Sequence, residues 1–111
     1  MTSIRITSEM WVSALRKRLD SQAIPIFLIK KGDKKAGAIL IRVSDLDGTS
    51  KIFEQAPSIE GTRHWMEIAS GLDADIEKLL RKQREFDNDV WILEVEAFKG
   101  VNFFENFLKI T

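Results

Sequence analysis

The stretch from residue 38 to residue 55, AILIRVSDLDGTSKIFEQ, decides the fold more than any other part of the chain. The apolar run Ala38 to Val43 predicts one strand, and Lys51 to Gln55 predicts another. Between them, Asp47-Gly48 favours a tight turn because both residue types tolerate a positive φ. Strands joined by so short a connection must run in opposite directions. We therefore expect an antiparallel hairpin here.

The flanking segments add two helices to this hairpin. Apolar residues at helical spacing predict one helix from Glu9 to Asp20, with Ser8 as its N-cap. A second helix is expected to begin at an Asp73 cap and to end near Phe86, followed by a turn at residues 87–89.

Three further strands are expected. They are Ile26 to Lys30, Thr62 to Ala69 (closed by Gly71) and Val90 to Ala97. The polar segment Lys31 to Lys35 predicts a hairpin connection after the first of these. In the last strand, Trp91, Leu93 and Val95 share one face, and Val90, Ile92, Glu94 and Glu96 share the other.

This order of elements predicts an α+β fold. We expect a two-layer arrangement: a mostly antiparallel sheet of four to five strands, an N-terminal helix, and a second helix before the last long strand. With 111 residues the chain has room for a single domain, residues 1–111.

Charge and composition exclude several classes of protein. Apolar residues make up 44% of the chain and charged residues 31%, which is typical of a soluble globular domain. No cysteine occurs, so disulfides and thiolate metal sites are excluded. No apolar run is long enough to span a membrane, and no signal peptide is evident. We expect a cytoplasmic protein that does not associate with membranes.

One segment resembles a catalytic motif. Asp45-Leu46-Asp47-Gly48-Thr49 after an apolar strand is similar to the phosphate-transfer signature of the haloacid dehalogenase superfamily, in which Asp45 would be the nucleophile, Asp47 the acid and base, and Thr49 a phosphate ligand. That chemistry needs a site at the carboxyl ends of parallel strands. A hairpin at this position favours the simpler interpretation, a turn.

The densest mixture of charged and aromatic residues lies near the end of the second helix. Candidate binding residues there are Arg84, Asp87, Asp89 and Glu94. The alternative is that residues 87–89 form a turn and that the basic residues balance the helix dipole. We assign no cofactor and no metal, and His64, the single histidine, is expected to have an ordinary structural role.

The C-terminal tail, residues 98–111, is rich in phenylalanine. Candidate interface residues are Phe103, Phe104, Phe107 and Leu108, which would join two subunits or complete the core.

Formal net charge is zero, with +4 on residues 1–55 and −4 on residues 56–111. Binding of nucleic acid through the N-terminal half is therefore the least favoured hypothesis; it would use Arg16, Lys17, Arg18, Lys30, Lys31, Lys34 and Lys35.

Several short motifs resemble a family of small uncharacterised bacterial proteins, domain of unknown function 1491. They are residues 11–16 (WVSALR), 31–33 (KGD), 36–38 (AGA), 46–48 (LDG) and 86–91 (FDNDVW), continuing to Glu94 and Glu96. The resemblance covers about residues 9–97. The family usually has proline where this chain has Asn88. The resemblance implies no activity and no catalytic residue, and it supports a hairpin turn at Asp47-Gly48.

These observations favour a non-catalytic binding or interaction domain, with a protein partner or a second copy of the chain as its ligand. The alternative is a small enzyme or metabolite binder with a pocket near the end of the second helix and the last strand.

Overall fold

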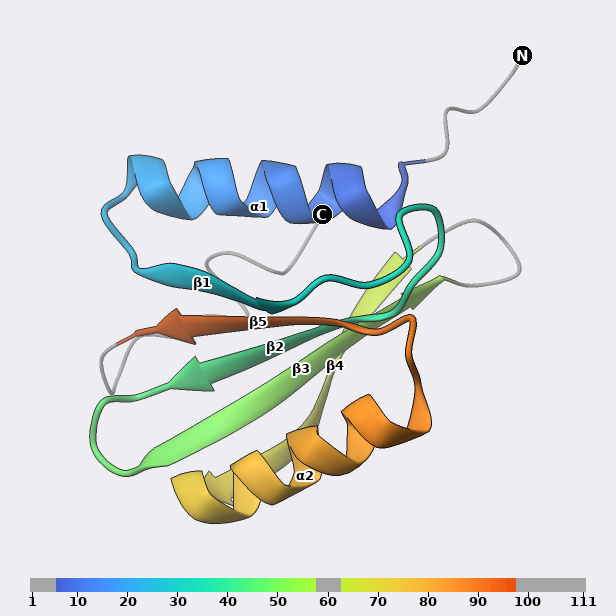
Figure 1. Cartoon of the computed structure of the whole chain (residues 1–111). Helices are drawn as coiled ribbons and strands as arrows, with labels where there is room; N and C mark the ends of the chain where they lie inside the picture. The colour runs from blue at the N-terminus through green and yellow to red at the C-terminus, as the bar shows by residue number, and fades with distance from the viewer. Residues whose placement is uncertain (1–5, 58–62, 98–111) are drawn as a thin grey trace.

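The computed structural model describes residues 6–57 and 63–97, which form one sheet and two helices (Figure 1). In chain order the elements are α1 (Ser8–Ser21), β1 (Ile26–Lys30), β2 (Ile39–Ser44), β3 (Thr49–Pro57), β4 (Arg63–Leu72), α2 (Asp73–Phe86) and β5 (Trp91–Glu96). The strand order across the sheet is β1-β5-β2-β3-β4. The predicted α+β class, with one helix at the N-terminus and one before the last strand, is confirmed.

The hairpin between β2 and β3 is confirmed. The two strands pair antiparallel from Ile39 opposite Gln55 to Ser44 opposite Ser50. Positive φ values occur at Leu46 (63°) and Gly48 (90°), and not at Asp47. The Asp47 amide donates a hydrogen bond to the Asp45 carboxylate at 2.8 Å.

Strand β5 lies between β1 and β2, antiparallel to β1 and parallel to β2. The predicted hairpin connection at Lys31 to Lys35 is therefore wrong, because the segment after β1 passes the start of β5 and leads to a non-adjacent strand. The physical reason lies in the composition of β5. Its residues Trp91, Ile92 and Leu93 are all buried, and only an interior strand with both faces covered can bury them.

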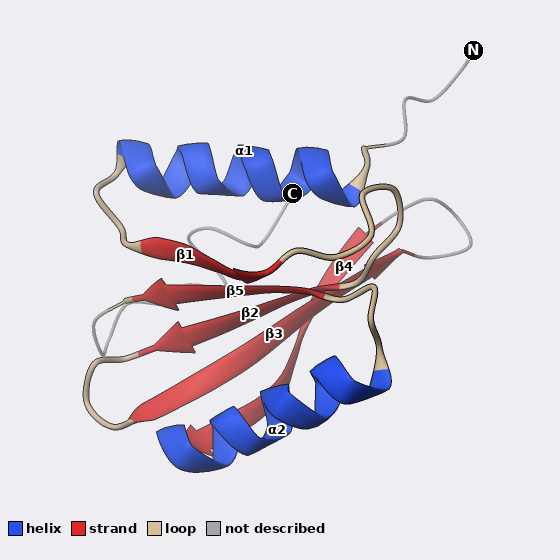
Figure 2. Cartoon of the chain, viewed as in Figure 1, coloured by secondary structure: helices blue, strands red, loops and turns tan. Residues whose placement is uncertain are grey.

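The two helices cover opposite faces of the sheet (Figure 2). On one face α1 contributes Val12, Leu15 and Leu19 to a core that also contains Leu93 and other apolar residues of the strands. On the other face, Ile76 and Leu80 of α2 pack with Leu40, Ile52, Val90 and Ile92. The arrangement thus has three layers rather than the expected two, because the central strands are apolar on both faces and each face requires its own cover.

Three predicted boundaries change. The N-cap of α1 is Thr7, whose hydroxyl accepts a hydrogen bond from the Met10 amide, and Ser8 is instead buried. Asp73 is the first residue of α2 rather than a cap, since no side chain caps that helix. Strand β4 continues through Gly71 to Leu72.

The candidate interface residues Phe103, Phe104, Phe107 and Leu108 lie outside the described residues. In the part of the chain that is described, neither helix has the length and apolar character needed to cross a bilayer.

Candidate ligand-binding groove

Arg42 is the centre of a charged cluster on the α2 face of the sheet. Alternation along β2 places its side chain on this face, between Glu94 of β5 and Ile52 of β3 in the same row across the sheet. The residue is only 9% exposed. Burying a guanidinium requires compensating partners.

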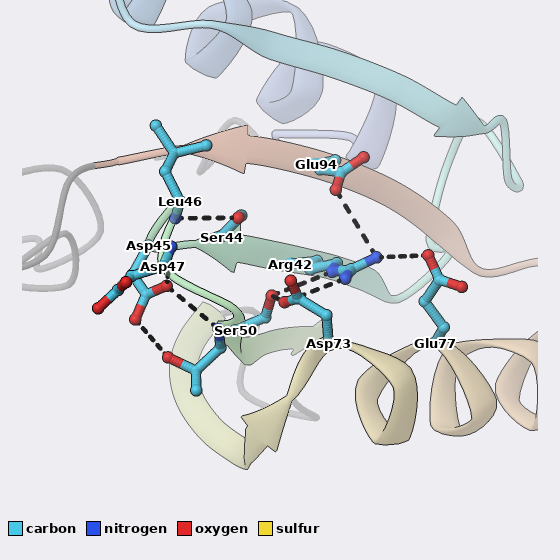
Figure 3. Close-up of polar contacts among 10 residues, drawn as sticks. Arg42, Ser44, Asp45, Leu46, Asp47, Ser50, Asp73, Glu77 and Glu94 are labelled. Atoms are coloured by element: carbon cyan, nitrogen blue, oxygen red, sulfur yellow. Dashed lines mark hydrogen bonds and ion pairs between the residues drawn. The ribbon is translucent and has the colours of Figure 1, made fainter.

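Four side chains supply those partners (Figure 3). The guanidinium lies 3.3 Å from carboxylate oxygens of Asp73 and Glu77 and 3.7 Å from one of Glu94, and its Nε donates to Ser50 Oγ at 3.2 Å. The Ser50 hydroxyl in turn donates to Asp73 at 2.5 Å. Because Asp73 and Glu77 belong to α2, the cluster attaches the first turns of this helix to the sheet.

A groove of about 300 Å³ runs beside the cluster, between α2 and the β1–β5 side of the sheet. Its walls and floor are part charged and part apolar, and are formed by Ile29, Arg42, Glu77, Leu80, Arg81, Arg84, Ile92, Leu93 and Glu94. This volume is near the lower limit of pockets that hold small ligands.

The charges in the groove fall into two groups. Glu77 and Glu94 are paired with Arg42. Arg81 and Arg84 are exposed and make no hydrogen bond or ion pair with any residue that the structure describes. Since arginine stays protonated, these two side chains present uncompensated positive charge at the mouth of the groove.

Of the four predicted binding residues, the structure brings Arg84 and Glu94 together in this groove. Asp87 and Asp89 do not line it. Asp87 accepts a hydrogen bond from the Asp89 amide at 2.9 Å, which shapes the turn before β5. The prediction missed Arg42, although an arginine inside an apolar strand was a visible signal.

Asp89 contributes its backbone to a contact between the 87–91 turn and the segment 31–38, which we call the junction. The Asp89 carbonyl accepts a hydrogen bond from the Asp33 amide at 3.0 Å, and Trp91 Nε1 donates to the Asp33 carbonyl at 2.7 Å. A Cβ on either Gly32 or Gly37 would overlap the Asp89 carbonyl oxygen. Glycine at these positions thus permits two backbone segments to touch.

The same junction holds α1 and β1. The amides of Ser8 and Glu9 donate to the Lys35 and Lys34 carbonyls, and the Ser8 hydroxyl donates to the Gly37 carbonyl at 2.6 Å. Lys30 Nζ donates to the carbonyls of Asn88 and Val90. These contacts give most of the family-like motifs a structural role.

The aspartates of the hairpin also have a structural role. Asp45 accepts hydrogen bonds from the amides of Asp47 and Thr49, at 2.8 and 3.2 Å, and from the Thr49 hydroxyl (Figure 3). The adjoining strands are antiparallel, whereas the phosphate-transfer site of the resembling superfamily requires parallel strands. The geometry therefore supports the interpretation of this motif as a turn.

The other predicted residues are spread over the molecule. His64 lies exposed on β4, opposite Ala56 of β3. Among residues 6–57 and 63–97, no three histidine, aspartate or glutamate side chains gather as a metal site would require. Of the basic residues considered for nucleic acid, Arg16 and Lys17 are exposed on α1, but Lys30 is directed at backbone carbonyls.

Comparison with known proteins agrees with the motifs and the fold. The family model described as "Protein of unknown function (DUF1491)" matches residues 6–105. The chain belongs to the DUF1491 family. Its predicted resemblance is thereby confirmed. No curated protein matches the sequence.

Solved structures, including those of DUF1491 family proteins, share this fold. The chain is similar to protein Atu0922 from A. tumefaciens, with a TM-score of 0.73 and 31% identity over 86% of this chain and 89% of that one. A crystal structure of a DUF1491 family protein from Caulobacter crescentus gives 0.73 and 30%, over 87% and 92% of the two chains. An NMR structure of a DUF1491 family protein from the same organism gives 0.75 and 29%, over 91% and 94%.

Proposed function

We propose that the chain is a non-catalytic interaction module that binds a protein partner at the groove beside α2. The observation that carries this proposal is the exposed Arg81–Arg84 pair next to exposed apolar side chains of an edge strand. Phe27 is 49% exposed and Ile29 45% exposed, and both lie on β1. Exposed apolar residues beside unpaired charge are typical of interaction surfaces.

The groove is better suited to binding than to catalysis. Its two carboxylates, Glu77 and Glu94, both pair with Arg42, and the described residues that line it include no histidine, serine or threonine. Arginine holds its proton too firmly to act as a general base. The cytoplasmic location expected from the sequence is part of this proposal.

Photocrosslinking in the native cell tests the proposal. A benzoylphenylalanine residue at position 29 should crosslink to a protein, and the Arg81→Glu/Arg84→Glu double variant should lose that product. The control is the same residue at position 14, an exposed site on α1. Equal crosslinking at positions 14 and 29, or at position 29 with the double variant, would contradict a docking site in this groove.

A further inference from the structure

Helix α2 leaves part of its side of the sheet uncovered. Five strands about 4.8 Å apart give a sheet about 20 Å wide between its outer strands, whereas one helix covers about 10 Å. Helix α2 packs on β3 and β4, and its Ile76 and Leu80 also reach Leu40 of β2 and Ile92 of β5, so the uncovered strip lies over β1. Phe27 and Ile29 are exposed there. This edge strand adjoins the groove that Arg81 and Arg84 line.

We propose that this strip, bounded by α2 and β1, binds an acidic amphipathic α-helix of another protein. The inference rests on the proposed function and names the class of its partner. A helix laid alongside α2 would cover Phe27 and Ile29 with its apolar face, in the manner of other helix-in-groove complexes.

The positive charges on α2 indicate which polar residues the partner helix should carry. Arg81 and Arg84 are three residues apart on α2, so their positions differ by about 4.5 Å along the helix axis. Carboxylates three or four residues apart on a neighbouring helix have matching spacing. Their pairing would satisfy both arginines, which have no acidic partner among the described residues.

A helix fits this surface better than an added strand. A strand pairing with the outer edge of β1 would extend the sheet sideways, leaving the exposed side chains on the sheet face uncovered. Strand β1 is also only five residues long, and its pairing is irregular between Leu28 and Lys30. Short and bulged edges are poor templates for strand addition.

Two fluorescent peptides of about 18 residues, roughly five helical turns, provide the test. Both have the same leucine, alanine and glutamate composition. The first peptide arranges these residues as an amphipathic helix with glutamates at positions i, i+3 and i+4. The second arranges the same residues in the polar–apolar alternation of a strand. Binding to the full chain is followed by fluorescence anisotropy, and the site is mapped by amide chemical shifts.

The helical peptide should bind, with shifts concentrated in β1 and the second half of α2. Arg81→Glu/Arg84→Glu should weaken its binding at least about tenfold, because like charges would then face each other. A matched charge reversal on α1, Arg16→Glu/Lys17→Glu, should leave the affinity within about twofold. The milder Ile29→Thr variant, which keeps a β-branched residue in the strand, should weaken binding about threefold or more.

Tighter binding of the alternating peptide would overturn the helical partner and indicate strand addition. Failure of both peptides, in a protein that still crosslinks to a partner from position 29, would overturn the helix while the interaction module stands. Equal loss of affinity in the α1 control variant would overturn the placement of the site.

Discussion

Replacing Gly37 by alanine should lower the free energy of unfolding far more than an ordinary glycine-to-alanine substitution does. The new Cβ would overlap the Asp89 carbonyl oxygen and lie 3.0 Å from the backbone of Asp33. Both obstacles are backbone atoms, so no flexible side chain can move aside. The 31–38 segment would have to withdraw by about 1 Å to restore normal contact distances.

The cost of that movement follows from the hydrogen bonds at the junction. The segment carries the bonds Asp33 N–H to Asp89 O, Trp91 Nε1 to Asp33 O, and Ser8 Oγ to Gly37 O, at 2.6–3.0 Å. Each contributes about 1 kcal/mol. We therefore expect Gly37→Ala to lower the free energy of unfolding by about 3 kcal/mol, which corresponds to roughly 15 °C in Tm for a domain of this size.

Urea unfolding followed by tryptophan fluorescence measures this change, with Gly48→Ala as the matched control. Gly48 has φ +90° and no atom within 4 Å of an added Cβ, so its replacement costs only backbone strain, about 1 kcal/mol. If Gly37→Ala proves no more harmful than Gly48→Ala, the close approach of these two backbone segments does not hold the fold together.

Three further substitutions test other parts of the structure by the same unfolding assay. Arg42→Met should cost about 2 kcal/mol, less than for a fully buried cluster because its carboxylate partners are 31–59% exposed; a change below about 0.5 kcal/mol would contradict the role given to Arg42. Asp45→Asn should cost about 1 kcal/mol by weakening the turn, and mass spectrometry should find no phosphoryl group on Asp45; a phosphorylated Asp45 would contradict the turn assignment. Trp91→Phe should cost about 1–2 kcal/mol because the Asp33 carbonyl loses its donor, and an unchanged midpoint would show that this bond is dispensable.

Local sequence patterns predicted the helices and strands, but they could not predict which strands distant in the sequence lie side by side. The β2–β3 hairpin followed from a short connection with Asp-Gly. The division of the β5 side chains between two faces was also evident from alternation. The insertion of β5 between β1 and β2 was not, because which strands become neighbours depends on contacts between segments far apart in the chain.

Tertiary contacts also explain the errors at single residues. Ser8 and Thr7 are both good caps, and Thr7 takes that position because the hydroxyl of Ser8 is bound to Gly37. Arg42 sits in an otherwise apolar strand with both faces buried. Its burial depends on carboxylates from α2 and β5, which no local window contains. The groove was located only through Arg84 and Glu94.

The proposed docking site requires that Arg81 and Arg84 serve a partner and not the fold. Its most direct test is the free energy of unfolding of the isolated Arg81→Glu/Arg84→Glu variant, measured against the unmodified chain. Because neither arginine side chain contacts a described partner, the difference should reflect only the reversed charge near the helix C-terminus, about 1 kcal/mol. A loss of about 2 kcal/mol or more would mean that these side chains stabilise the domain itself and are not reserved for a partner.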